Sequence, residues 1–209
     1  MGIKERRTKE KEIRRNKILK AAKVLFFKQG FAATSMNQIA KKVELSKGTL
    51  YLYYKNKEEL YVSLLIEGTE LLNKAFAKAI EGKTTWHEKL RALGWAYYQF
   101  SKDYQQFFHI NFQFQQGEIT RNISNDLFNQ CFEAGFESLG FLSEAIEQGI
   151  STSEIKKGNP MSLAVVLWGS LTGIILLYEG EVHQKFMPES LENLIKNSID
   201  ILTKGLKKT

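Results

Sequence analysis

The residues best suited to chemistry follow a serine in the first quarter of the chain. Ser46 precedes Lys47, Gly48 and Thr49, and the apolar Leu50 comes next. Serine is favoured at the position just before a helix, so the next three residues are expected to open one. A lysine can donate hydrogen bonds to guanine O6 and N7 or to a phosphate, and a glycine lets another molecule come close to the backbone. The pattern therefore indicates contact with a nucleic acid.

Two short helices, over residues 36–43 and 47–53, are expected to position these residues. Ser35 and Gln38 match a capping box that would open the first helix, and Glu44-Leu45 would form the turn. The apolar sides of the two helices consist of Ile39, Ala40, Val43, Leu50 and Tyr54. This is a helix-turn-helix pattern, in which the front of the second helix can enter a major groove.

An ordinary helical hairpin within a core is the alternative interpretation. It would leave Lys47, Thr49, Tyr51 and Tyr53 pointing away from the apolar side, beside Lys55. Such exposed tyrosines are unusual on a surface that binds nothing, so we favour the DNA-binding interpretation.

The charge of the chain is concentrated at its N-terminal end. Residues 1–60 hold 16 Lys and Arg against 6 Glu, a net charge of +10, whereas the whole chain has +7. A basic head on a mildly acidic body indicates a polyanionic partner. Residues 4–20 alone contain nine basic residues and three Glu. This arm can lie along a DNA backbone, enter a minor groove or form a solvated helix start, and the sequence does not choose among the three.

The residues from Phe31 to Leu60, FAATSMNQIAKKVELSKGTLYLYYKNKEEL, resemble the DNA-binding domain of the tetracycline-repressor (TetR) family. The resemblance includes the preceding stretch from Ile18 and covers about 45 residues. It implies a homodimeric, helical transcriptional regulator whose C-terminal domain binds a small-molecule effector and carries the dimer interface. Repression is the usual outcome in the family, and activation stays open.

The resemblance also implies which residues contact DNA. Two departures from the family pattern are Tyr54, where phenylalanine is more usual, and Glu44-Leu45, which replace a more usual Gly-Val. Glu44 then needs an exposed position, and the Tyr54 hydroxyl is expected to find water. The predicted DNA-binding residues are Thr34, Ser35, Ser46, Lys47, Gly48, Thr49, Tyr51, Tyr53 and Lys57.

The whole chain is predicted to be all-α with about nine helices, because helical spacing recurs throughout and strand signals are nearly absent. We expect a three-helix DNA-binding domain over residues 1–58 and a helical effector-binding and dimerisation domain over residues 59–209. The later helices are expected near residues 60–82, 86–103, 105–116, 121–148, 160–178 and 188–206. A single cysteine, Cys131, excludes a disulfide framework, and with no apolar segment at the N-terminus we expect a cytoplasmic protein.

The sequence offers little for catalysis or metal binding. The three histidines, His87, His109 and His183, are far apart, and none lies in an HExxH motif. Walker, GxGxxG and GxSxG motifs are absent from the sequence. We therefore expect no enzyme, metal or cofactor.

Residues 61–209 hold 19 of the 25 aromatic residues, which can fill a core or line an apolar effector pocket between helices. Arg91 or Arg121 would anchor an anionic effector, whereas Glu118, Glu133 or Glu137 would accept a cationic one. We favour a largely apolar effector. The predicted ligand-binding residues are Trp95, Tyr98, Phe112, Phe132, Phe136, Trp168, Arg91 and Arg121.

Residues 160–178 carry no charge and are long enough to span a bilayer. Gly169 and Gly173, four residues apart, permit close helix contact in lipid or in water. We favour a homodimer in which this helix and the one near 188–206 form a four-helix bundle with a second copy, without a membrane. The expected function is a DNA-binding regulator released from its operator by an effector. The alternatives are an effector-free architectural DNA-binding protein and a helical lipid-binding module.

Overall fold

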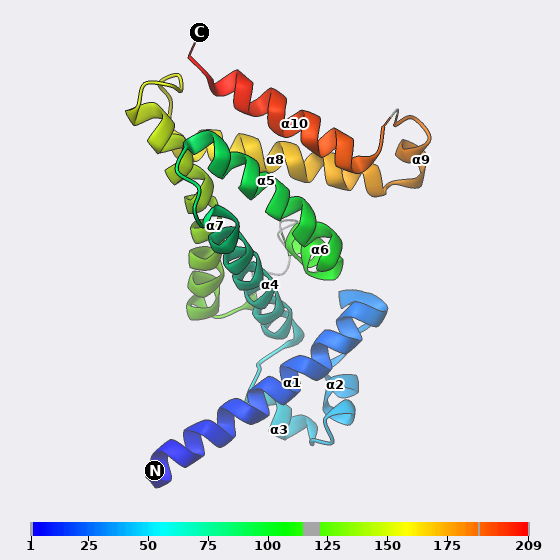
Figure 1. Cartoon of the computed structure of the whole chain (residues 1–209). Helices are drawn as coiled ribbons and strands as arrows, with labels where there is room; N and C mark the ends of the chain where they lie inside the picture. The colour runs from blue at the N-terminus through cyan, green and yellow to red at the C-terminus, as the bar shows by residue number, and fades with distance from the viewer. Residues whose placement is uncertain (1, 115–121, 188, 209) are drawn as a thin grey trace. The chain divides into compact units, whose positions relative to one another are not determined.

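The computed structural model describes residues 2–114, 122–187 and 189–208, and within them the chain is helical without a strand (Figure 1). The all-α prediction is therefore confirmed. Ten helices are found in this part of the chain: α1 (Ile3–Ala33), α2 (Met36–Lys42), α3 (Lys47–Tyr51), α4 (Lys57–Ile80), α5 (Trp86–Asp103), α6 (Gln105–Phe114), α7 (Asn125–Ser151), α8 (Pro160–Glu179), α9 (Glu181–Gln184) and α10 (Leu191–Leu206).

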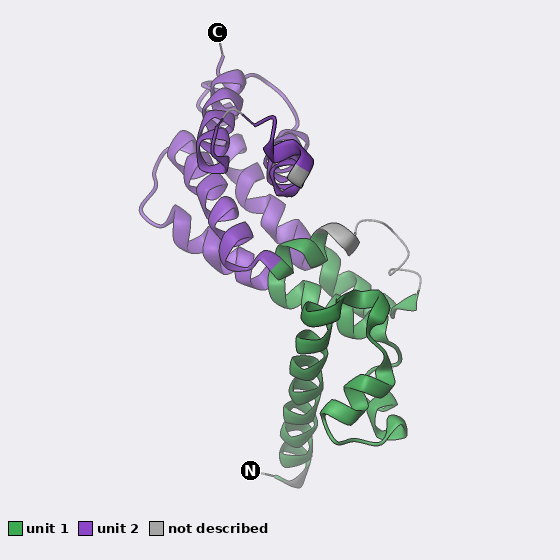
Figure 2. Ribbon diagram, turned by 90° about the vertical axis from the view of Figure 1, so that its right-hand side faces the viewer, with its two compact units in different colours: residues 1–68, 106–132 green, residues 69–105, 133–209 purple. Residues whose placement is uncertain are grey.

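The chain forms two compact units, which are coloured separately in Figure 2. Unit 1 consists of residues 1–68 and 106–132, and unit 2 of residues 69–105 and 133–209. The first half of α4 and the described part of α6 thus group with the N-terminal helices. The functional domain boundary near residue 58 stays a prediction.

The core of unit 1 holds the short helices α2 and α3 against α1 and α4. Ile18 of α1, Ile39 of α2, Leu50 of α3 and Leu60 of α4 are all completely buried. The Tyr61 ring packs edge-on against Phe26 and Phe31, with ring centroids 5.3 and 4.9 Å away. These contacts fix the position of α2 and α3, which are too short to be stable alone.

Side-chain caps begin both helices of the predicted helix-turn-helix. Ser35 Oγ accepts a hydrogen bond from the Gln38 backbone N–H at 3.3 Å, and Gln38 Oε1 accepts one from the Ser35 N–H at 2.8 Å. Ser46 Oγ accepts from the Thr49 backbone N–H at 3.1 Å. The capping box and the second cap lie where the sequence predicted them, and they satisfy N–H groups that a helix start leaves unpaired.

The first helix includes the basic arm and continues past a kink. It begins at Ile3, so the basic arm is a continuous helical extension of α1. At Gly30 the φ angle is +77°, which interrupts the helical backbone, yet one more helical turn follows. The Tyr54 hydroxyl was expected to find water, but it accepts a hydrogen bond from Arg15 Nε at 3.3 Å, and the guanidinium lies 4.9 Å from the centre of its ring.

Unit 2 is built from the second parts of α4 and α7 together with α5, α8, α9 and α10. Asn73 of α4 is buried, and its amide donates to the Ala134 carbonyl at 3.1 Å and to Glu137 Oε2 at 2.8 Å on α7. Helix α8 begins near the predicted residue 160, and the structure shows Asn159 as its cap and Pro160 as its first residue. The four-residue α9 was not predicted.

The turn between α2 and α3 has a Schellman geometry that favours glycine. The Leu45 N–H donates to the Ala40 carbonyl at 3.0 Å and the Glu44 N–H to the Lys41 carbonyl at 3.3 Å. This places Glu44 at φ 58°, a left-handed conformation that costs residues other than glycine free energy. Glu44 is exposed, as the missing glycine required.

Replacing Glu44 with glycine should therefore raise stability. We expect Glu44→Gly to increase the free energy of unfolding by about 1 kcal/mol relative to Glu44→Ala, because alanine keeps the left-handed strain and glycine removes it. Thermal melting followed by circular dichroism measures the difference. Equal melting temperatures for the two variants would show that the turn is not strained.

Candidate functional site

The front of α3 points outward because the opposite side of the helix is anchored in the core. Leu50 is completely buried, whereas Lys47 and Gly48 are exposed and Thr49 is half-buried. Two of the predicted residues, Ser46 and Thr49, bond to one another, with their hydroxyl oxygens 2.8 Å apart. Since that contact engages its hydroxyl, Thr49 presents mainly its methyl group to a partner.

Nothing in the protein itself requires a glycine at position 48. A β-carbon built there would meet only Ser46 Oγ, 3.9 Å away, so the space around it is open. Glycine within a helix lowers stability relative to alanine by roughly 0.5–1 kcal/mol. A residue that costs stability without serving the packing points to a partner that must come close to the backbone.

The end of α3 presents aromatic and apolar side chains beside this front. Tyr51 is exposed and Tyr53 half-buried, and Lys47 Nζ lies 5.8 Å from the centre of the Tyr51 ring. Leu52, which was not among the predicted residues, is 77% exposed. Its position two residues after the buried Leu50 was the available signal, and an exposed apolar group here can contact a thymine methyl.

Thr34 and Ser35 share a predicted role but differ in exposure. Ser35 is exposed at the start of α2, whereas Thr34 is only 2% exposed. The Thr34 hydroxyl donates to the Gly30 carbonyl at 2.7 Å, so this side chain closes the end of α1. A DNA contact by Thr34 would have to come through its backbone, and Ser35 is the stronger candidate of the two.

Lys57 at the start of α4 already has internal partners. Its Nζ donates to the Phe31 carbonyl at 3.0 Å and to the Thr34 carbonyl at 3.3 Å, and it lies 4.3 Å from the centre of the Phe31 ring. An ammonium group has three N–H donors, so one is left for a phosphate. Lys57 thus ties α4 to the end of α1 at the edge of the candidate DNA-binding surface.

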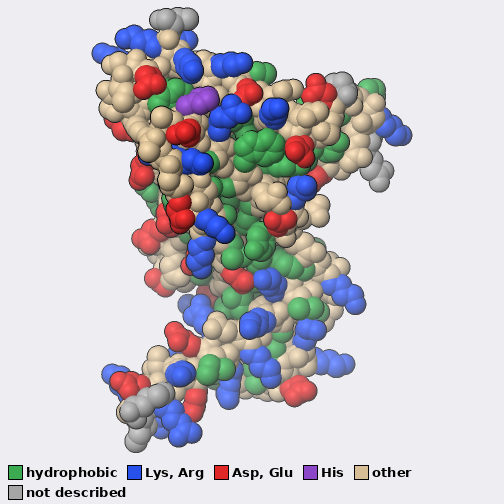
Figure 3. All heavy atoms as spheres, in the orientation of Figure 1, with side chains coloured by type: hydrophobic (Ala, Val, Ile, Leu, Met, Phe, Trp, Pro, Cys, Tyr) green, Lys and Arg blue, Asp and Glu red, His purple; other side chains and the backbone are tan. Residues whose placement is uncertain are grey.

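The N-terminal helices carry positive charge that ion pairs hardly neutralise. Figure 3 shows many Lys and Arg side chains over the N-terminal helices, and others over unit 2. Among the described residues of unit 1, only Arg6–Glu10 and Lys23–Glu67 form ion pairs, at 2.9 and 2.8 Å. The remaining cations, including the exposed Lys47, are available to phosphates, which dominate the affinity of proteins for DNA.

Unit 2 contains an apolar cavity between α4, α5, α7, α8 and α10. About 400 Å³ of empty space lies between the lining residues when space open to solvent is included, and the centre of a water molecule can occupy only about 20 Å³ of it. Trp168 is the one predicted ligand-binding residue among those that line it. The lining residues are Phe76, Leu90, Leu93, Gly94, Tyr97, Leu142, Leu167, Trp168, Leu171, Ile199, Leu202 and Thr203.

Four of the other predicted ligand-binding residues do not line this cavity. Trp95 packs against the buried Tyr98, with ring centroids 5.6 Å apart, and neither lines the cavity. Phe132 and Phe136 are exposed on α7. Arg121 and the side chain of Phe112 lie outside the part of the chain that the structure describes. The ligand-binding role of these residues stays a prediction.

Residues 18–64 match the family described as bacterial regulatory proteins, tetR family. The chain is 27% identical, over 88% of its length and 93% of the relative, to an uncharacterized HTH-type transcriptional regulator, YhgD, of Bacillus subtilis. It is 24% identical, over 95% of its length and 98% of the relative, to a Bacillus subtilis protein named fatty acid metabolism regulator protein. A tetR-family regulatory protein from Rhodococcus RHA1 superimposes with a TM-score of 0.70 at 17% identity, covering 93% of this chain and 97% of that one.

The N-terminal helix-turn-helix domain of the chain belongs to the TetR family. The family match includes the two capped helices and the front of α3, and it ends within α4. The protein is therefore a TetR-family DNA-binding transcriptional regulator, and such a regulator is not a class of enzyme. Which residues of this TetR-family protein touch DNA remains a prediction from the motif and from their exposure.

The open space at Gly48 gives a test that separates folding from binding. We expect Gly48→Ala to leave the melting temperature unchanged or slightly higher, because the methyl group fits and alanine favours the helix. Its affinity for the DNA duplex that the wild type selects from a random pool should fall about tenfold or more, which corresponds to the removal of one good base contact. Both quantities are measured by thermal melting and by fluorescence anisotropy.

Gly135→Ala is the matched control, since a β-carbon at this half-buried position of α7 also meets nothing within 4 Å. It should leave the DNA affinity unchanged, and its melting temperature should be unchanged or slightly higher, as in Gly48→Ala. Unchanged DNA affinity in Gly48→Ala would remove the front of α3 from the DNA contact.

Proposed function

We propose that the chain is a homodimeric transcriptional repressor of the cytoplasm. Two copies of α3 would enter successive major grooves of one operator, about 34 Å apart, and an apolar effector bound in unit 2 would lower the affinity for that operator. The observation that carries the DNA-binding part is the outward front of α3, where Lys47 and Gly48 are exposed while Leu50 is buried. The effector must favour one of two states of the protein, because equal binding to both would shift nothing.

The dimer is supported by an exposed apolar stripe on α8. Val166, Gly169 and Leu177 are exposed at helical spacing, and Val166 and Leu177 are apolar side chains at 56% and 47% exposure. β-carbons at Gly169 and Gly173 would meet nothing within 4 Å, so another helix can approach closely along this line. An exposed surface of this kind on a soluble protein marks an interaction site.

Helix α10 has a matching stripe. Leu194, Ser198, Ile201 and Gly205 follow one another at spacings of three or four residues, and Ile201 is 69% exposed. Helices α8 and α10 pack against each other within unit 2. Two such helix pairs, one from each copy, would bury both stripes in a four-helix bundle.

Helix α8 is also long and apolar enough to cross a membrane by length and composition. Burial in a dimer and burial in lipid would both cover its exposed side, so an experiment must separate them. We propose the dimer because the stripe contains glycines and a serine, Ser170, and continues on the amphipathic α10.

A charge introduced into the stripes should separate the copies. We expect Val166→Glu combined with Ile201→Glu to convert a dimer at micromolar concentration into a monomer, because two charges per copy would be buried at the interface. Analytical ultracentrifugation measures the change. Ile13→Glu, at a 60% exposed position of unit 1, is the control and should stay dimeric. A wild-type monomer, or wild-type protein that sediments with membranes, would overturn the proposed dimer.

The cavity of unit 2 suits an uncharged, apolar ligand group. Its polar atoms already bond internally: Trp168 Nε1 donates to Tyr97 Oη at 3.0 Å, and Tyr97 Oη and Thr172 Oγ1 are 2.7 Å apart. Burial raises the pKa of Tyr97 to about 12, so its hydroxyl stays neutral at physiological pH. With no lining residue left to pair a charge, the lining suits an alkyl or acyl chain, and the cavity would have to widen to admit one.

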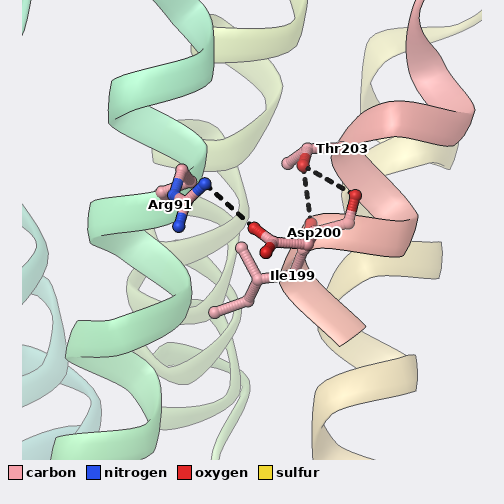
Figure 4. Close-up of polar contacts among 4 residues, drawn as sticks. All are labelled: Arg91, Ile199, Asp200 and Thr203. Atoms are coloured by element: carbon pink, nitrogen blue, oxygen red, sulfur yellow. Dashed lines mark hydrogen bonds and ion pairs between the residues drawn. The ribbon is translucent and has the colours of Figure 1, made fainter. Parts of the chain in front are cut away.

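The two predicted anion anchors do not change this conclusion. Arg91 Nη1 of α5 lies 2.9 Å from Asp200 Oδ1 of α10, beside Ile199 and Thr203 of the cavity wall (Figure 4). A carboxylate would have to displace Asp200 to reach it, and Arg121 lies outside the described residues. A polar head group would therefore remain in solvent. The name of the relative that regulates fatty acid metabolism supports the same ligand class.

A larger side chain in the cavity should weaken the response to the effector and spare DNA binding. We expect Leu202→Phe to bind the selected duplex like the wild type but to need about tenfold more palmitic acid or palmitoyl-coenzyme A for half release, since overpacking costs about 1–3 kcal/mol. Leu139→Phe, the same substitution on α7 outside the cavity lining, is the control. Fluorescence anisotropy of the labelled duplex follows the release.

The outcome also discriminates between function classes. If neither acyl compound releases the duplex from the wild type, the acyl effector is wrong. If a broad collection of apolar compounds also fails, an effector-free architectural protein becomes the better description.

A further inference from the structure

Helix α1 carries a basic face that the front of α3 does not account for. We propose that Lys4, Arg7, Lys11, Arg14 and Arg15 form a second DNA-contacting surface, which binds the phosphate backbone next to the base pairs that α3 reads. The proposal rests on the proposed function only in taking duplex DNA as the partner. The surface defined by these five residues is called the basic stripe below.

The stripe follows from the geometry of one continuous helix. Each residue of an α-helix turns by about 100°, so the five cations fall within a sector about 100° wide. Further along α1, the same sector contains Ile18 and Ala22, which are completely buried against the other helices of unit 1. The face that packs the core over one part of α1 is thus the face that carries the cations over its first turns.

Because the basic stripe lies in the same sector of α1 as the buried Ile18 and Ala22, it faces the same side as α2 and α3. In Figures 1 and 2 both helices lie on one side of α1, and Ile18 of α1 is completely buried. Arg15, the last residue of the stripe, contacts Tyr54 directly after α3. The cations before it therefore extend the surface that contains the front of α3, and they do not point to the opposite side of the head.

The charge on the stripe is uncompensated. Lys4, Arg7, Lys11 and Arg14 are exposed, and their side chains have no hydrogen-bond or ion-pair partner among the residues that the structure describes. The three glutamates of the arm fall outside the sector, and one of them, Glu10, pairs with Arg6 at 2.9 Å. A stripe of one sign with the opposite charges turned away is complementary to a polyanion.

The dimensions of the stripe fit a DNA backbone. From Lys4 to Arg15 the helix rises by about 16 Å at 1.5 Å per residue. Phosphates of one strand succeed each other by about 3.4 Å along the duplex axis, so the stripe lies beside about five base pairs. Lysine and arginine contacts to phosphates carry no sequence information, and the stripe therefore adds affinity without changing which sequence is chosen.

The test compares two variants of equal charge in the full-length chain. The stripe variant carries Lys4→Gln, Arg7→Gln and Lys11→Gln. The control variant carries Lys9→Gln, Lys17→Gln and Lys20→Gln, three exposed cations on the other faces of the same helix. Circular dichroism and thermal melting establish that both remain folded. The probes are the duplex that the wild type selects from a random pool and a scrambled duplex of the same composition.

The stripe variant should bind both duplexes more weakly, by about tenfold or more at physiological salt. The slope of log affinity against log salt should become shallower by about 0.9 for each phosphate that the variant no longer neutralises, up to about 2.7 per protomer. The control variant should keep the wild-type slope, because its cations touch no phosphate. The ratio of the two affinities, which measures sequence preference, should not change in the stripe variant.

Equal losses of affinity in both variants would overturn the proposal, because they would reflect net charge alone. Wild-type slopes in both variants would overturn it as well. Failure of the proposed function is recognised separately: the wild type would then select no sequence, while the slopes on the scrambled duplex still decide whether the stripe contacts phosphates.

Discussion

The DNA-binding surface depends on the burial of one side of a five-residue helix. Isolated helices shorter than about 12–15 residues are marginal in water, so α3, at five residues, cannot present side chains in fixed positions by itself. Leu50 in the core of unit 1 and the Ser46 cap hold it in place. Because Leu50 and the Ser46 cap fix the orientation of α3, its front, Lys47 to Thr49, faces outward. The DNA contacts proposed for α3 all follow from this arrangement, in which one side of the short helix is buried and the other side is exposed.

Helix α1 is likewise buried in part and exposed in part, but over a longer segment of the chain. One sector of this helix is apolar where the other helices of unit 1 cover it, and basic where they do not. A single rigid element thus supports the helix-turn-helix and extends positive charge beyond it. In unit 2, one set of apolar side chains lines the cavity, and another set forms the exposed stripes of α8 and α10. The cavity can hold a ligand, and the exposed stripes can bind another copy of the chain.

Much of this architecture could be predicted from local sequence. The caps at Ser35, Ser46 and Asn159 depend on side chains within three residues of the bond they make, and α5 runs from Trp86 to Asp103 as its periodicity indicated. Contacts between distant residues could not be predicted in this way. Arg15 is 39 residues from the Tyr54 hydroxyl that it reaches, and Arg91 is ion-paired to Asp200 across two helices. Burial of Thr34 likewise follows from neighbours that no sequence spacing reveals. Aromatic content suggested a pocket, but which residues line it depends on the packing of five helices.

The front of α3 is expected to touch the bases and phosphates of a duplex, and the proposed function depends on this contact. A crystal structure of the chain with the duplex it selects from a random pool tests it most directly. We predict that Lys47 lies within hydrogen-bonding distance of a base edge or a phosphate, and that the backbone at Gly48 is in van der Waals contact with the DNA. A complex in which α3 faces solvent while another surface holds the duplex would contradict the account.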